Sequence, residues 1–289
     1  PRSVSPDVAA AAAASARFHA RASREMLDDV TTFFRRDTGD VSRDAWDRYM
    51  RYRARKHADE AANVVVVNPS TPAQYFHALR RQALAPHLKP TVVFSPKFLL
   101  HHRPCVSRLD HLGPRERFRA VIADGDPGDN VHAERSERSN PRETRRVVLC
   151  SGKVFYALSH ARASRKMDDV ALVRLEQLHP FPHDALAERL ARYPNAEVVW
   201  AQEEPKNMGF WTFAKPRVDT TLRALARGDG VRDARDGTRA RTIRYVGRPA
   251  AASPATGSPF IHARETRAVV DEALGARGDN GSGDDSHHA

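Results

Sequence analysis

The feature that most constrains the fold is a repeated alternation of short apolar runs with longer segments of helical periodicity. Four runs rich in Val, Leu and Ile, at residues 146–150, 170–175, 197–201 and 242–246, have the length and composition of buried strands. Segments with helical spacing separate them, and one more, at 262–274, follows the last run. Parallel strands need crossovers of this kind. The sequence therefore predicts an α/β fold: a mostly parallel sheet with helices on both faces.

A shorter strand–helix–strand unit is expected upstream. Residues 64–67 are all Val and residues 91–95 are mostly apolar, so both segments favour strands. Thr71 and Pro72 are typical of a helix start, and Gln74 stands where it would close a capping box. Apolar residues then recur at helical spacing, as Tyr75, Phe76, Leu79 and Leu84.

Changes in amino-acid composition along the sequence also suggest where domains begin and end. Residues 124–146 are rich in Arg, Asp, Glu, Gly and Pro, which predicts a linker or solvent-facing insertion between 63–123 and 147–275. Residues 1–62 specify no clear buried face, so this region is poorly defined and disorder is one interpretation of it. Residues 276–289 have the composition of a disordered tail. The first residue is Pro rather than Met, which suggests a fragment boundary.

Charge and composition limit the function classes. The formal net charge is +11, and residues 63–146 hold 14 Lys and Arg against 8 Asp and Glu. A basic nucleic-acid binder is therefore one alternative, but no basic amphipathic helix with base-reading side chains is evident, so we expect no nucleic-acid partner. The longest apolar stretches fall far short of the roughly 20 residues of a membrane helix, which predicts no membrane association. Two cysteines cannot form a multi-cysteine zinc site, and no metal site is expected.

Ligands of parallel α/β sheets bind beyond the carboxyl ends of the strands, so the turns that follow the strands are candidate sites. Ser151, Gly152 and Lys153 open a helix and would suit a phosphate or carboxylate, or form only a tight turn with a solvated Lys. Glu203 and Glu204 are an acid/base pair or, as we favour, a salt-bridging or helix-N-terminal pair. The two cysteines, Cys105 and Cys150, lie apart from any His and acid in sequence, which predicts buried or inert thiols.

Several longer motifs run through the sequence. Residues 68–82 read NPSTPAQYFHALRRQ and residues 89–97 read KPTVVFSPK. Further motifs follow: CSGKVFY at 150–156, RLEQLHPFP at 174–182, RYPNAE at 192–197, QEEPKNMG at 202–209, YVGRP at 245–249 and SPATG at 253–257. In this order they resemble the thiamine diphosphate-dependent first component of the 2-oxoglutarate dehydrogenase complex. The 2-oxoadipate dehydrogenase family shares most of these motifs and is the nearest alternative.

The resemblance implies a transketolase-like carboxyl-terminal domain preceded by the end of a pyrimidine-binding domain. It also implies a homodimer that uses thiamine diphosphate and magnesium, and that passes a succinyl unit to the lipoyl-bearing succinyltransferase of the complex in the tricarboxylic acid cycle. The family in eukaryotes works in the mitochondrial matrix. Most of the cofactor-binding apparatus should lie upstream of this sequence, so the catalytic residues are unknown. We expect a fragment that is inactive alone; a stand-alone regulatory or interaction module is the alternative from another class.

One family site falls inside the sequence. Some members bind an activating nucleotide, acetyl-CoA or AMP, at the junction of the two domains, and the resemblance maps this site onto Arg81, Arg117 and Gln177. Two guanidinium groups suit a phosphate, and an amide can hydrogen-bond a base. Ala120 and Asp184 depart from the family pattern. The alternative is that Arg81 and Arg117 form interdomain ion pairs.

Overall fold

The computed structural model describes five stretches of the chain, and all elements named below belong to one compact unit within residues 63–289. The described residues are 61–85, 89–126, 129, 141–227 and 241–275. The expectations for residues 1–60 and 276–289, and for most of 124–146, therefore lie outside the described residues.

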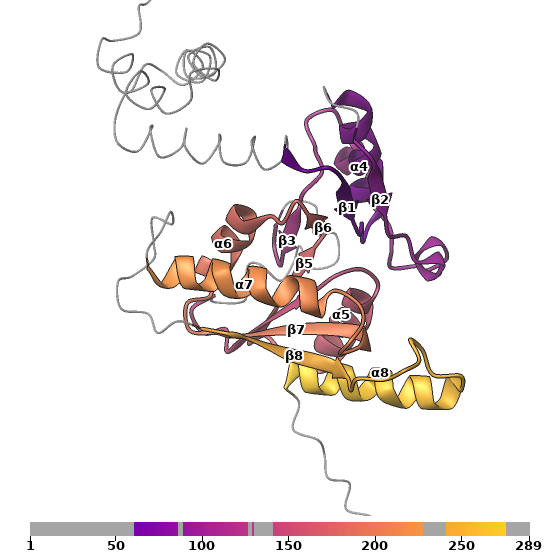
Figure 1. The fold of residues 1–289 in the computed structure, drawn as a ribbon, viewed down its shortest axis with the longest axis vertical. Coiled ribbons are helices and arrows are strands. Elements are labelled where there is room, and N and C mark those ends of the chain that lie inside the picture. Colours follow the sequence, from indigo (N-terminus) through magenta and orange to yellow (C-terminus); the bar gives the residue numbers. More distant parts are fainter. Residues whose placement is uncertain (1–60, 86–88, 127–128, 130–140, 228–240, 276–289) are drawn as a thin grey trace, which may run out of the picture. The chain divides into compact units, whose positions relative to one another are not determined.

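A five-stranded sheet forms the centre of the unit (Figure 1). Its strand order is β3 (Val121–Ala123), β5 (Val170–Leu175), β4 (Arg146–Cys150), β7 (Glu197–Pro205) and β8 (Ile243–Arg248). Strand β4 is parallel to β5 and to β7, and β7 is parallel to β8. The mostly parallel sheet predicted from the sequence is confirmed. The sequence did not predict β3, which pairs antiparallel to β5 and makes the sheet mixed.

Helices cover both faces of this sheet, as the apolar strands predicted. Val147 and Leu149 point to the face covered by α6 and α7, whereas Val148 and Cys150 point to the face covered by α5 and α8. The alternation follows from the two-residue period of a strand, and it explains why β4 is apolar throughout. The helix bounds are α5 Val154–Ser164, α6 His183–Ala191, α7 Trp211–Ala226 and α8 Pro259–Leu274.

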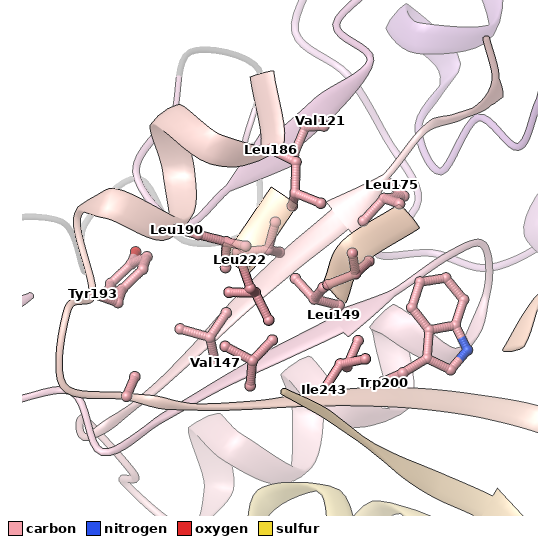
Figure 2. Packing of buried hydrophobic residues seen from close by; sticks show 14 of the residues in the cluster. Val121, Val147, Leu149, Leu175, Leu186, Leu190, Tyr193, Trp200, Leu222 and Ile243 are labelled. Carbon is pink, nitrogen blue, oxygen red and sulfur yellow. The ribbon is translucent and has the colours of Figure 1, made fainter. Parts of the chain in front are cut away.

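The larger side chains of the first face interlock between the sheet and α6 and α7 (Figure 2). Leu186 and Leu190 of α6, Leu222 of α7 and Trp200 of β7 are at most 1% exposed. A fully buried side chain of this size contributes about 1.5–3 kcal/mol through removal of apolar surface from water. This packing fixes the positions of the loops that follow β4, β5 and β7.

A second, three-stranded sheet has the order β2 (Thr91–Val93), β1 (Val65–Val67) and β6 (Gln177–His179). Strands β1 and β2 are parallel and are joined through helix α4 (Pro72–Leu84), which confirms the predicted strand–helix–strand unit. Strand β6 pairs antiparallel to β1 and follows β5 after a single residue, Glu176. One continuous segment therefore joins the two sheets.

The start of α4 differs from the predicted capping box. The Thr71 hydroxyl accepts a hydrogen bond from the Gln74 backbone N–H at 3.2 Å, as predicted. The Gln74 side chain bonds instead to the backbone of Arg119, donating to its carbonyl at 2.6 Å and accepting from its N–H at 3.1 Å. The prediction that Gln74 closes the box was wrong because a distant segment offers both a donor and an acceptor.

Two short 3₁₀ helices, η1 (Lys97–Leu100) and η2 (Leu109–Leu112), lie between β2 and β3. The predicted division at 124–146 stays a prediction. The structure shows that β3, placed before that boundary, pairs with β5, which lies after it. Among the described helices, none has the length and apolar character needed to span a bilayer.

Candidate functional site

The candidate site lies where the loop after β1 meets the end of β5. The Ser70 backbone N–H donates to Glu176 Oε2 at 2.8 Å, and the Ser70 hydroxyl donates to Glu176 Oε1 at 2.5 Å. Both residues are fully buried, and the Asn68 N–H donates to the Glu176 carbonyl at 2.8 Å. The carboxylate therefore holds the loop against the five-stranded sheet through both of its oxygens.

Arg174, the one charged residue of β5, completes this contact. Its guanidinium donates to the Ser70 hydroxyl at 2.9 Å and to Asp129 Oδ1 at 2.9 Å. It also lies over the Phe155 ring, with the guanidinium carbon 4.1 Å from the ring centroid. Arg174 is 1% exposed and Asp129 is 4% exposed, so this ion pair is removed from water. Such a pair stabilises a fold only when its hydrogen bonds are well formed.

A second buried arginine sits next to the first. Arg162 of α5 donates to both oxygens of Asp124, at 2.5 and 2.9 Å, and to the Val170 carbonyl at 3.1 Å. Asp124 also accepts from the Leu172 N–H at 2.9 Å. The bidentate geometry is the one that suits guanidinium and carboxylate best. Three carboxylates and two guanidiniums thus occupy one buried cluster, which we call the junction cluster: Asp124, Asp129, Arg162, Arg174 and Glu176.

Burial dominates the electrostatics of the junction cluster. It raises the pKa of the Glu176 carboxyl, although Arg174 and the hydrogen bonds from Ser70 act in the opposite direction. It also raises the pKa of Asp129, again against Arg174. Removal from water disfavours the charged form of an acid, and one guanidinium shared by two carboxyls offsets this only in part.

Two weakly acidic groups border the cluster. The Tyr156 hydroxyl donates to the Ser70 carbonyl at 2.6 Å, and Cys105 Sγ lies 3.5 Å from the same oxygen. Burial raises the pKa of both groups. It raises the pKa of Cys150, which is fully buried, to about 12. The predicted burial is confirmed for Cys150, whereas Cys105 is only partly buried, and the inertness of the two thiols stays a prediction.

The three residues predicted to bind an activator are only partly brought together. Arg81 Nη1 donates to Gln177 Oε1 at 2.7 Å, and the Arg81 guanidinium carbon lies 4.2 Å from the centroid of the Phe118 ring. Gln177 is buried and donates to the Pro180 carbonyl at 2.7 Å. Arg117 is exposed, on the segment before β3. The role of all three in nucleotide binding stays a prediction.

The strand-end turns form structural contacts. Gly152 has a φ of +72°, and a Cβ there would come within 2.6 Å of Asn68 Nδ2, so this position requires Gly. Lys153 pairs with Glu203 at 3.0 Å. The interpretation as a tight turn is therefore confirmed, although the Lys side chain, still 35% exposed, is also paired with a carboxylate. Glu203 is salt-bridging, as we favoured from the sequence, although its partner comes from the turn after β4.

Sequence reasoning missed the junction cluster itself. The one available signal was a lone Arg within the apolar run VALVRL at residues 170–175. Its partners could not be found, because Asp124 and Asp129 lie in the segment predicted to be a linker. Ser70 stood out only as part of a longer motif, and Glu176 and Gln177 only as one of the candidate turns that follow the predicted strands. The contacts join residues 104 and 106 positions apart in sequence.

The described residues do not provide a complete cofactor site. No group of three or more His, Cys, Asp or Glu residues among them could hold a metal ion. The guanidiniums of the junction cluster are engaged by carboxylates, and four of its five residues are buried, so it does not fit a magnesium diphosphate group. The geometry instead suits a structural role: fixing the segment before the five-stranded sheet onto that sheet.

Comparison with known proteins identifies the family. The family profile described as "2-oxoglutarate dehydrogenase C-terminal" matches residues 106–274. The chain is 43% identical over 213 residues to the 2-oxoglutarate dehydrogenase E1 component of Brucella anthropi, a match covering 74% of this chain and 20% of that protein. The E1 component of Brucella ovis is 42% identical over the same length. The chain thus spans about a fifth of the length of these curated relatives. It belongs to the 2-oxoglutarate dehydrogenase E1 family, an oxidoreductase family, and corresponds to its C-terminal region.

Proposed function

We propose that this chain serves as the C-terminal region of an enzyme that oxidatively decarboxylates 2-oxoglutarate and transfers the succinyl unit to a lipoyl group. The observation that carries the proposal is the 43% identity to an E1 component over 74% of the chain. Thiamine diphosphate supplies the electron sink for decarboxylation in such an enzyme. The described residues of this chain have a structural role in such an enzyme, and we assign them no catalytic step.

The junction cluster supports this structural role. Ser70 and Glu176 hold the loop after β1, which precedes the region matched by the family profile, against the end of β5 within it. Buried, charge-assisted hydrogen bonds fix such a connection more tightly than a mobile linker would. The region therefore acts as a rigid end piece that sets the position of the preceding domain.

A chimera tests this proposal. Residues 63–275 replace the matched region of the Brucella anthropi E1 component, and 2-oxoglutarate decarboxylation is measured with an artificial electron acceptor. We expect an active chimera and no activity from the 289-residue chain alone. Activity of the isolated chain at the rate of the full enzyme would show that it does not depend on the rest of an E1 component, and would contradict the proposal. An inactive but folded chimera would contradict the assignment to this enzyme.

The same chimera also tests which substrate the enzyme prefers. We propose 2-oxoglutarate rather than 2-oxoadipate, because the relatives at 42–43% identity are named for 2-oxoglutarate. The ratio of kcat/KM for the two substrates in the chimera, compared with that of the parent enzyme, measures any preference that this region contributes. A shift of the ratio toward 2-oxoadipate would favour the alternative.

We also propose that Arg81, Arg117 and Gln177 bind a nucleotide activator, acetyl-CoA or AMP. The contact of Arg81 with Gln177 supports this, since it places a cation beside an amide that can hydrogen-bond a ligand. The test measures activation of the chimera by each nucleotide. We expect Arg81→Ala to abolish activation, whereas Arg267→Ala, at an exposed arginine of α8, leaves it unchanged. Equal activation of both variants would show that Arg81 acts structurally.

The remaining assignments concern the oligomeric state, the partner in the complex and the cellular location. We propose a homodimer that works with the lipoyl-bearing succinyltransferase of the complex, and a mitochondrial matrix location in a eukaryotic cell. Support comes from the family alone. Light scattering of the chimera tests the dimer, co-sedimentation with the succinyltransferase tests the complex, and fractionation of cells that express a tagged chain tests the location.

A further inference from the structure

Glu176 differs from Asp129, the other acid beside Arg174, in the groups that bind it. Asp129 Oδ1 accepts directly from the Arg174 guanidinium at 2.9 Å. Glu176 is fully buried, yet its two oxygens accept from the N–H and the hydroxyl of Ser70, which are neutral donors. Arg174 reaches Glu176 only through that hydroxyl, to which it donates at 2.9 Å. Within the described part of the chain, Glu176 is thus a buried carboxyl without a directly bonded cation.

The charges of the junction cluster leave Glu176 one cation short. Asp124 and Arg162 form a bidentate pair that is neutral by itself. The single positive charge of Arg174 is engaged by Asp129. An ionised Glu176 would therefore add an unbalanced negative charge to a site removed from water, which costs free energy. Binding one proton removes that charge.

The other titratable or polar groups that act on Glu176 do not supply the missing charge. They are the Gln74 amide of α4, the Tyr156 hydroxyl of α5, the Cys150 thiol of β4 and the Cys105 thiol between η1 and η2. Burial raises the pKa of the phenol and of both thiols, so these groups stay neutral at neutral pH. Two further guanidiniums, of Arg189 and Arg192, bind Asp126 and are partly exposed, so solvent screens their effect on Glu176.

The contact with Ser70 is compatible with a protonated Glu176. The Ser70 N–H donates to Oε2, which is the carbonyl oxygen if the proton lies on Oε1. Oε1 and the Ser70 hydroxyl oxygen are 2.5 Å apart, a distance at which either oxygen can donate to the other. A neutral Glu176 therefore keeps the loop after β1 in place with both of its oxygens hydrogen-bonded.

We propose that Glu176 is a proton-dependent latch: with one proton bound it holds the loop after β1 against β5, and loss of that proton to solvent as the pH rises releases the loop. Burial raises the pKa of Glu176, which agrees with this direction, because the closed form favours the proton more than a solvated open form does. The release is local, since β4 and β5 keep their apolar packing on both faces. The latch needs no substrate or cofactor, so its test is independent of the proposed function.

Surface labelling at different pH values tests the latch. A photoactivated carbene reagent is applied to the 289-residue chain between about pH 6 and about pH 9, and labelling of residues 68–74 is read by mass spectrometry. Loss of one proton raises the open population by at most about tenfold per pH unit, and we expect a rise of about tenfold or more over this range. Residues 147–150, fully buried in β4, report global unfolding and should stay unlabelled. A constant or falling signal at 68–74, or a parallel rise at 147–150, would overturn the proposal.

Glu176→Gln separates the Glu176 proton from other effects of pH. The amide keeps the size of the side chain and stays uncharged, so labelling of residues 68–74 should change by less than about twofold over the same range. Glu197→Gln is the matched control, because this exposed carboxyl pairs with Arg146 and Arg244 away from the latch. It should retain the wild-type rise. A wild-type rise in Glu176→Gln, or its loss in Glu197→Gln, would contradict the assignment to Glu176.

Asp129→Asn provides a second test that leaves Glu176 in place, and it decides the matter if Glu176→Gln does not fold by circular dichroism. With Asp129 uncharged, the Arg174 guanidinium balances an ionised Glu176. The rise in labelling of residues 68–74 should therefore move to higher pH by about one unit or more. An unchanged pH dependence, or a move to lower pH, would show that Glu176 is not the acid left without a cation and would overturn the proposal.

Discussion

The two sheets of this protein differ in how they are covered. Every strand of the five-stranded sheet has buried side chains, and α5 to α8 supply apolar partners for its two faces. The three-stranded sheet is accompanied by α4, which exposes its large apolar side chains. The first region has its apolar faces covered within this chain, whereas the second leaves several large apolar side chains exposed. We therefore expect the five-stranded region to contribute most of the stability of the isolated chain.

The contact between the two regions is polar at its centre. The junction cluster and Ser70 form it with buried ions and hydrogen bonds. Apolar contacts tolerate small shifts, but a bidentate ion pair or a carboxylate bonded through both oxygens tolerates few. The cluster therefore specifies the position of the loop after β1 relative to β5. The following predictions test this contrast, from the largest expected effect to the smallest.

Arg174→Leu should reduce the free energy of unfolding by about 3–5 kcal/mol, because it leaves the buried carboxyls of Asp129 and Glu176 without their shared cation. Urea unfolding of the 289-residue chain measures the change. Arg108→Leu is the matched control, since Arg108 and its partner Asp110 are 76% and 60% exposed. We expect that change to stay within about 0.5 kcal/mol. Similar losses of unfolding free energy for both variants would show that burial does not decide how much an ion pair contributes to stability here.

Leu186→Ala should cost about 2–5 kcal/mol, since the side chain is fully buried between α6 and the sheet and its loss leaves a cavity. Thermal or urea unfolding measures it. The same substitution at Leu109, which is 86% exposed, should be nearly neutral. A small effect at Leu186 would mean that the five-stranded region is less tightly packed than its burial indicates.

Gly152→Ala should destabilise the chain by about 1–3 kcal/mol, because a side chain at positive φ is strained and its Cβ would meet the Asn68 amide. Gly257→Ala is a suitable control, since an added Cβ there has no neighbour within 4 Å. Unfolding midpoints of the two variants provide the comparison. Equal midpoints would show that the loop after β1 moves freely away from the β4 turn.

The pH dependence of stability should report the ionisation of Glu176. Its pKa is raised above the ordinary value of 4.5 by burial, so the folded state favours the protonated form. The stabilisation from this group is complete below the unfolded pKa and is lost as pH rises through the raised folded pKa. The unfolding free energy of the wild type should therefore fall relative to that of Glu176→Gln as pH rises from about 4 toward neutrality.

Glu197 provides the control of opposite sign. Partial burial alone would raise its pKa, but hydrogen bonds and charge from Arg244 and Arg146 lower the pKa overall. The unfolding free energy of the wild type should therefore rise relative to that of Glu197→Gln as pH rises from the acid range. Parallel slopes for the two comparisons would contradict the assigned environments.

Leu79→Ala should change the stability of the isolated chain by no more than about 0.5 kcal/mol, because the side chain is half exposed and its helix packs through other residues. Differential scanning calorimetry measures the shift. A loss comparable with that of Leu186→Ala would show that α4 is packed through its apolar face after all, and would remove the contrast between the two regions.

Most strands and helices of the described part could be predicted from local sequence. The bounds of β4 and β5 equal the predicted 146–150 and 170–175, because a run apolar on both faces has few alternatives to a buried strand. Strands β3 and β6 were missed. Each has three residues and lacks the consecutive Val residues that mark β1 and β2, which are equally short.

The candidate site was less predictable for the same reason. The Gly152 turn and the buried thiol of Cys150 followed from residue type and neighbours. The partners of Arg174 did not, because Ser70 and Asp129 are distant in sequence and lie in loops. The side of α4 that faces inward was equally hidden, since helical spacing shows that apolar residues share a face but not which protein segment covers that face.

The sequence by itself determined the α/β alternation, the ends of the main strands and, through its motifs, the resemblance to 2-oxoglutarate dehydrogenase. These depend on local patterns, which hydrophobic burial and backbone geometry translate directly into elements. Only the tertiary structure decided that Ser70, Arg174 and Glu176 meet in one buried cluster and that α4 exposes its apolar side. Such contacts depend on which distant segments can satisfy a buried charge or cover a surface, and short-range sequence patterns carry no information about that choice.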